Sequence, residues 1–320
     1  MHLVIPFASA LSDAAGQAFG TLALANLERL LGRWAAIPDA ASGDIAEPDE
    51  YTLSLPHERL LARLRGWPVV DGLLPFAAEA ARADGLAVAQ GEGWGELTPT
   101  HWLVGRDQIN LIDPAVLALD DAESSRLFDA LAPLFVELGW DLHRADAMRW
   151  YARHPSLAEL PTAAIDRVIG RNVDLWLNDH PGILAVRRLQ SEVQMLLYVH
   201  PLNDAREARG LRPVNSFWLA GTGPAADPRQ ALPADVLVDD RLRAPALAED
   251  WTAWAEAWAA LDAGPVRALA EAAAREPAGA HAISLCGERI ARTWRAAARP
   301  WWKSLLRGRG ADAPALLGAL

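Results

Sequence analysis

The chain has 320 residues, 52% of them hydrophobic, so it can form one large domain or two moderate domains with substantial cores. Its formal net charge of −11 argues against a nucleic-acid-binding surface, because phosphate backbones bind basic faces. A single cysteine, Cys286, excludes an intramolecular disulfide and a multi-cysteine metal site. The sequence has no apolar run of membrane-spanning length and no signal-peptide pattern at its start, so we expect a cytoplasmic protein without a membrane span.

The first part of the chain predicts strands and helices in alternation. Residues 3–7 form a short apolar run that is typical of a buried strand, and leucines at helical spacing predict a helix over residues 21–34. Residues 36–50 are rich in Ala, Asp, Gly and Pro, which predicts a loop. A further helix is expected to begin near Ser54, with Pro56 in its first turn.

The middle of the chain predicts both helices and strands. Asp120 and Glu123 have the spacing of a capping box, in which Asp replaces the usual Ser or Thr, and a leucine stripe follows them. This pattern predicts a helix that ends at Gly139. The other expected elements are a helix over residues 75–83, strands over residues 97–104 and 109–112, and a helix over residues 187–199.

The last part of the chain returns to short strands, expected at residues 236–238 and 282–285. Between them, tryptophans and a leucine recur at helical spacing, a pattern typical of a helix that faces the core: Trp251, Trp254, Trp258 and Leu261. The alternation of strands and helices favours an α/β fold.

The C-terminal tail, residues 292–309, combines arginines and Lys303 with three tryptophans, Trp294, Trp301 and Trp302. We predict an amphipathic helix that packs on the sheet. The alternative is an interaction surface for an acidic partner or a membrane surface, because Trp and Arg are enriched at interface hot spots.

A polar run near residue 200 leads directly into an apolar strand. Asn203, Arg206 and Arg209 lie three residues apart on a helix expected to end at Gly210, so they share one face. The preferred interpretation is that these residues tie the helix end to the following strand. The alternative is that they bind a small carboxylate or phosphate together with Asn215, because guanidinium and amide groups recognise such anions.

The block His200–Gly223, with HPLNDAREARG followed by PVNSFWLAGTG, resembles the archaeal-type cofactor-independent phosphoglycerate mutases of the alkaline-phosphatase-like superfamily. Three further segments keep that family's order: Ala25–Leu30, Asp71–Ala80 and Thr162–Asn172. The resemblance implies an α/β fold with an alkaline-phosphatase-like core sheet flanked by helices, formed by residues 1–70 and 211–320. It also implies an inserted α+β domain over residues 71–210.

The resemblance implies two divalent metals and a serine nucleophile. The positions that match these roles most closely are Ser54 and His57 for the nucleophile, and Asp239, Asp240, Glu288 and His281 for the metals.

The chain departs from the family's pattern at several of these positions. No carboxylate follows the first strand at Pro6-Phe7, and Asp239–Arg243 stands where the family has a Gly-His-Asp element. Glu288-Arg289 replaces an Asp-His pair, which puts a fixed cation where a metal ligand is expected.

Two hypotheses about function follow. In the first, the protein has lost its metal-dependent site, needs no cofactor and acts as a regulatory or binding pseudoenzyme, similar to the proteobacterial regulatory proteins of the RpfE type. Its partner would be a small phosphorylated or carboxylate ligand, or a regulatory protein. In the alternative, it is an active 2,3-bisphosphoglycerate-independent phosphoglycerate mutase or a metal-dependent phosphatase, with Mn or Mg bound in a rearranged site.

Overall fold

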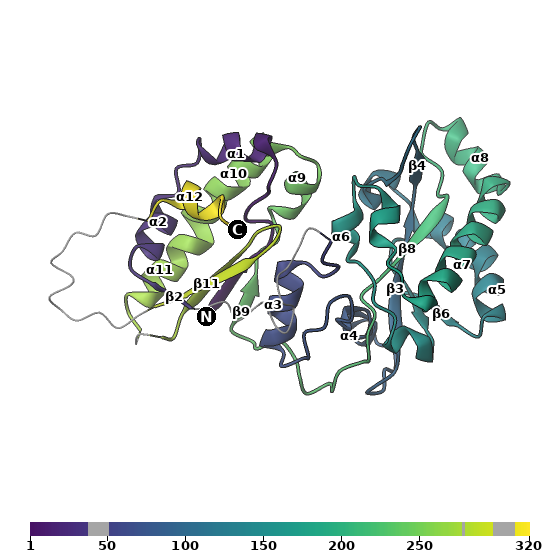
Figure 1. Cartoon of the computed structure of the whole chain (residues 1–320), viewed down its shortest axis with the longest axis horizontal. Coiled ribbons are helices and arrows are strands. Elements are labelled where there is room, and N and C mark those ends of the chain that lie inside the picture. The colour runs from purple at the N-terminus through teal and green to yellow at the C-terminus, as the bar shows by residue number, and fades with distance from the viewer. Residues whose placement is uncertain (38–50, 277–278, 297–310) are drawn as a thin grey trace, which may run out of the picture. The chain divides into compact units, whose positions relative to one another are not determined.

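The computed structural model describes residues 1–37, 51–276, 279–296 and 311–320 (Figure 1). The described chain divides into two compact units. The first is formed by the described residues of Met1–Glu50, Leu55–Gly66 and Ala231–Leu320. The second is formed by Tyr51–Ser54 and Trp67–Gln230. None of the described helices is long and apolar enough to cross a membrane.

The first unit contains a mixed five-stranded sheet in the order β2-β11-β10-β1-β9. β1 (His2–Ile5) lies between β9 (Val236–Val238) and β10 (Ala282–Cys286) and runs parallel to both, with Leu3 opposite Leu237 and Ile283. β11 (Ala291–Arg295) and β2 (Ala35–Ile37) extend the sheet with antiparallel pairing. The strands expected near residues 3–7, 236–238 and 282–285 are therefore all present.

The two faces of this sheet are covered by different helices. Leu3, Ile5 and Leu285 face a core to which α10 (Trp251–Leu261) contributes Trp254 and Trp258, both fully buried. Val4 and Cys286 alternate to the opposite face, where they pack with Leu60 of α3. The remaining helices of the unit are α1 (Asp13–Phe19), α2 (Ala25–Leu31), α3 (Pro56–Leu64), α9 (Arg243–Leu247), α11 (Arg267–Ala273) and α12 (Ala313–Leu317).

The second unit contains a four-stranded antiparallel sheet in the order β6-β7-β3-β8. Its strands are β3 (Trp94–Thr100), β6 (Asp141–Arg144), β7 (Trp150–Arg153) and β8 (Ser216–Ala220). A separate two-stranded sheet pairs β4 (Trp102–Val104) with β5 (Ile109–Leu111).

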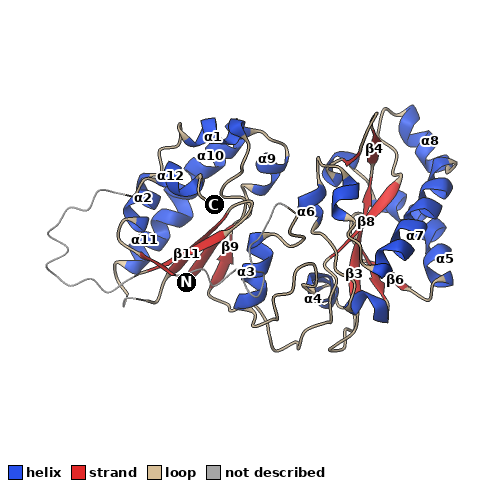
Figure 2. Cartoon of the chain, viewed as in Figure 1, coloured by secondary structure: helices blue, strands red, loops and turns tan. Residues whose placement is uncertain are grey.

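Helices pack on both faces of the four-stranded sheet (Figure 2). On one face, Leu97 and Phe217 contact a core that includes Leu131 of α5 (Asp121–Glu137) and Val193 of α7 (Pro181–Tyr198). On the other face, Trp94 packs with alanines of α4 (Phe76–Ala83). The unit also contains α6 (Ile165–Val168) and α8 (Pro201–Ala208).

The predicted border between the domains differs from the observed one at its C-terminal end. Residues 211–320 were expected in the core domain, but β8 pairs with β3 over Ser216–Ala220, which places this strand in the second unit. The observed change of unit lies at Gln230 and Ala231.

Three element predictions were also wrong. The helix expected over residues 21–34 is limited to α2, and the strand expected over residues 97–104 is two strands, β3 and β4, in different sheets. The start of the tail is the strand β11 instead of a helix, and its Trp294 is buried. Trp301, Trp302 and Lys303 lie outside the described residues.

Candidate functional site

The carboxyl ends of β1, β9 and β10 meet at one edge of the first unit's sheet, because the three strands run parallel. In α/β proteins this edge is the usual place for a ligand. Phe7 follows β1, Asp239 follows β9, and Glu288 follows β10. Two of the predicted metal ligands, Asp239 and Glu288, therefore lie at the same sheet edge.

The carboxylate of Asp239 is paired with the guanidinium of Arg241. Nε of Arg241 donates to Oδ1 of Asp239 at 2.7 Å, and a terminal nitrogen donates to Oδ2 at 2.8 Å. This bidentate contact engages both carboxylate oxygens and neutralises their charge. Asp240, the next residue, is exposed, and its backbone carbonyl accepts the N–H of Arg243 at 2.8 Å.

The ends of β10 and β1 carry local structural contacts. Glu288 accepts the backbone N–H of Leu11 through Oε2 at 3.1 Å. Phe7 has left-handed backbone geometry, with φ at 55°, and its carbonyl accepts the indole N–H of Trp254 at 3.0 Å. The ring of His57, on α3, lies 5.3 Å from the ring of Phe7. An aromatic pair therefore occupies the position at the end of β1 where the family resemblance implies a metal-binding carboxylate.

The predicted ligands do not form one cluster. Within the described ranges, no three His, Cys, Asp or Glu side chains are arranged to hold a metal ion. His281 precedes β10, so it lies at the opposite edge of the sheet from Asp239 and Glu288, and its Nε2 is 3.1 Å from a carboxylate oxygen of Glu276.

Ser54 belongs to the second unit and binds backbone groups there. Its Oγ accepts the N–H of Gly72 at 2.8 Å, and its own N–H donates to Oδ1 of Asp71 at 2.8 Å. Gly72 has φ at +72°, and a Cβ there would lie 2.9 Å from Cβ of Pro161. Buried at 3% exposure, Ser54 closes a tight turn that only glycine fits.

Asn203 and Asn215 each bridge backbone segments. Nδ2 of Asn203 donates to the carbonyls of Leu197 and Val214, and its Oδ1 accepts the N–H of Val214 at 3.0 Å. Asn215 bonds both backbone groups of Trp102, accepting its N–H at 2.7 Å and donating to its carbonyl at 2.9 Å. Both amides thus tie α8 and β4 to the segment before β8.

Arg206 and Arg209 converge on one carboxylate, that of Glu123 on α5. Arg206 is fully buried, and it also donates to the carbonyls of Arg212 at 2.9 Å and Leu117 at 2.5 Å. Anion binding by Asn203, Arg206, Arg209 and Asn215 remains a prediction, and these contacts instead favour the structural interpretation of the four residues.

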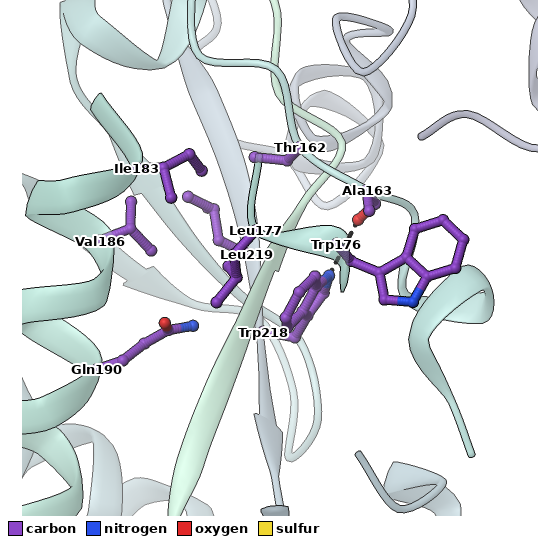
Figure 3. A pocket seen from close by; sticks show the side chains of 9 residues that line it. All are labelled: Thr162, Ala163, Trp176, Leu177, Ile183, Val186, Gln190, Trp218 and Leu219. Atoms are coloured by element: carbon purple, nitrogen blue, oxygen red, sulfur yellow. Dashed lines mark hydrogen bonds between the residues drawn. The ribbon is translucent and has the colours of Figure 1, made fainter. Parts of the chain in front are cut away.

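A small cavity lies between α7 and β8 (Figure 3). Its volume is about 10 Å³, enough for about one water molecule. The indole N–H of Trp218 donates to the carbonyl of Ala163 at 3.0 Å, and Nε2 of Gln190 donates to the carbonyl of Phe217 at 3.2 Å. The cavity is therefore a packing gap that is too small for a ligand.

A much larger cavity, of about 400 Å³, lies where β4 and β5 meet the C-terminal end of α7 and α8. Asn203 and Asn215 belong to its lining, whereas Arg206 and Arg209 do not. Its exposed carboxylates, Asp204 and Glu207, were missed from the sequence, although their spacing of three residues in the same polar run could have indicated a shared face.

A half-buried carboxyl, that of Glu96 on β3, was also missed. Desolvation by burial raises its pKa to about 7, and the neighbouring carboxylates of Asp146, Asp84 and Asp166 add to the rise. No sequence pattern distinguishes it, because every second residue of a strand can face outward and a glutamate between apolar neighbours is expected there.

Comparisons with known proteins give only distant likenesses. No protein-family model and no curated protein matches the chain. Among solved structures, a cofactor-independent phosphoglycerate mutase from Thermoplasma acidophilum is similar with 13% identity and a TM-score of 0.37, over 98% of this chain and 94% of that one. The PH0037 protein from Pyrococcus horikoshii is similar with 11% identity and a TM-score of 0.47, over 92% and 87%. With both TM-scores below 0.5, no residue role is carried over from either structure.

Proposed function

We propose that this chain is a binding or regulatory protein whose first unit has no working metal-dependent phosphoryl-transfer centre. The proposal rests on the bidentate contact of Arg241 with Asp239 at the carboxyl edge of the sheet. A divalent ion would have to displace this guanidinium, which already satisfies both oxygens of the carboxylate.

The neighbouring strand ends support the same proposal. A two-metal phosphoryl-transfer site needs several carboxylate and imidazole ligands on converging elements. The end of β1 instead offers Phe7, which packs against the ring of His57, and Glu288 accepts the backbone N–H of Leu11. The regulatory role implied by the resemblance to RpfE-type proteins is part of this proposal.

An assay of phosphoglycerate interconversion with added Mn²⁺ tests the proposal. We expect no turnover above that of a blank without enzyme. Asp239→Asn and Asp240→Asn form a matched pair, because both remove one carboxylate at the end of β9 but only Asp239 carries the Arg241 contact. Turnover by the wild-type chain that Asp239→Asn abolishes and Asp240→Asn preserves would overturn the proposal and support the alternative of an active mutase.

A further inference from the structure

Apolar side chains line part of the large cavity of the second unit, some of them exposed and some buried. Val104 and Tyr198 are 74% and 86% exposed, and Trp102, which also lines the cavity, is 7% exposed. At about 400 Å³, the cavity lies within the range of ~300–1,000 Å³ that small-molecule sites occupy. The apolar wall therefore has room for the hydrophobic body of a small ligand.

The charged groups of the lining are all acidic. Asp204 and Glu207 lie three residues apart on α8 and so share a face, and the lining contains no Lys, Arg or His. Within the described ranges, neither carboxylate makes an ion pair or a side-chain hydrogen bond. The nearby guanidiniums of Arg206 and Arg209 are instead held by Glu123.

Two neutral side chains of the lining are engaged with the protein itself. Asn203 and Asn215 use their amides to bridge backbone segments. Asp204 and Glu207 carry the charge of the lining, and a carboxylate favours a hydrogen-bond donor that carries positive charge.

We propose that this cavity binds an organic cation, an ammonium or guanidinium group on an apolar stem. The charged head would pair with Asp204 and Glu207, and the stem would lie against Trp102 and Tyr198, whose ring faces also attract cations. The cation is either a free amine or the basic side chain of a peptide.

The edge of β4 beside the cavity distinguishes these two sources. The backbone N–H and C=O of Leu111 on β5 bond Arg171 and Gly170 and not β4. Trp102 lies opposite Leu111, so its own N–H and C=O point away from β5, where the side chain of Asn215 bonds both. Val104, two residues further along, therefore also turns its N–H and C=O outward. An extended peptide would pair with them, whereas a free amine would not.

Calorimetric titration with three probes that share one apolar body tests the charge selection. The probes are 2-phenylethylamine, 2-phenylethanol and 3-phenylpropanoate, which are cationic, neutral and anionic at neutral pH. We expect the amine to bind at least about tenfold more tightly than the alcohol, and the acid not to bind, because the ion pairs exist only for the cation.

Two double variants locate the binding site. Asp204→Asn/Glu207→Gln is expected to weaken amine binding about tenfold or more. Asp129→Asn/Glu137→Gln makes the same change in charge on exposed positions of α5, outside the cavity lining, and is expected to leave amine binding unchanged. Thermal denaturation checks that both variants remain folded.

The source of the cation is tested with acetyl-Ala-Arg-Ala-amide. Binding about tenfold tighter than that of 2-phenylethylamine indicates a peptide that pairs with Val104, and equal or weaker binding indicates a free amine. Either result supports a cation site. Equal binding of the three phenyl probes, unchanged amine binding in Asp204→Asn/Glu207→Gln, or no binding of either the amine or the peptide would overturn the proposal.

Discussion

Two side chains whose pKa values are shifted by burial make the stability of this protein depend on pH. Burial raises the pKa of Glu96 to about 7 in the folded state, above its unfolded value of 4.5. Between these two pH values the unfolded chain has released the proton while the folded chain still binds it. The contribution of Glu96 to stability is therefore full below about pH 4.5 and is lost as the pH rises toward 7.

Glu96→Gln removes this dependence. We expect the variant to be more stable than the wild type at pH 8 by on the order of 1–3 kcal/mol, and to differ little from it at pH 4.5. Urea denaturation at the two pH values measures the difference. A gain of the same size at both would show that Glu96 does not titrate in this range.

His2 changes the stability with pH in the opposite direction to Glu96. Burial and the nearby Arg295 lower its pKa from 6.5 to about 4, and its Nε2 lies 2.7 Å from Oγ of Ser284. Its contribution to stability is present above pH 6.5 and is lost as the pH falls toward 4. The pH ranges of the two residues overlap and their effects on stability have opposite slopes, so a variant at either position isolates the contribution of the other.

At the scale of elements, the helix end near residue 200 is fixed by a buried ion pair. Arg206 is fully buried against Glu123, whereas Arg209 is 52% exposed at the same carboxylate. Removal of the buried guanidinium takes the donor from one oxygen of the buried Glu123 carboxylate and from the carbonyls of Leu117 and Arg212, whereas removal of the exposed one leaves the buried pair intact.

We therefore expect Arg206→Ala to lower the free energy of unfolding by about 3–5 kcal/mol. Arg209→Ala is expected to lower it by about 1 kcal/mol or less. Urea denaturation measures both values. Similar values for the two variants would contradict the assignment of Arg206 as the structural partner of Glu123.

Local patterns in the sequence predicted several elements well. The tryptophan stripe of α10 and the apolar runs of β1, β9 and β10 follow from spacing and burial alone. The pairing of strands did not follow, because the run 217–219 reads as apolar whichever sheet it joins. Only its register with β3, more than a hundred residues earlier in the chain, places β8 in the second unit.

The same limit applies to the candidate sites. The sequence placed Asp239 and Glu288 after two expected strands, and the structure brings both to one sheet edge. It could not show that Arg206 meets Glu123, which lies 83 residues away in the chain. Nor could it show that this carboxylate neutralises the arginines near residue 200 while two other carboxylates line the large cavity.

At the scale of the whole molecule, residues Tyr51–Ser54 belong to the second unit although they precede α3 of the first. The carbonyl of Leu53 accepts the N–H of Ala164 at 3.1 Å, and Oγ of Ser54 accepts that of Gly72 at 2.8 Å. We expect a fragment of residues 51–230 to unfold cooperatively, and at a temperature several degrees above that of a fragment of residues 67–230. Equal melting temperatures by circular dichroism would show that residues 51–54 do not stabilise this unit.

At the scale of the whole molecule, we predict that the carboxyl edge of the first sheet binds no catalytic metal, because the guanidinium of Arg241 engages both carboxylate oxygens of Asp239. Electron paramagnetic resonance of free Mn²⁺, titrated into the wild-type protein at neutral pH, measures whether the metal binds. We predict that the signal of free Mn²⁺ equals that of a protein-free control at every point. Loss of one or two equivalents of the free signal per chain, restored by Asp239→Asn, would contradict it.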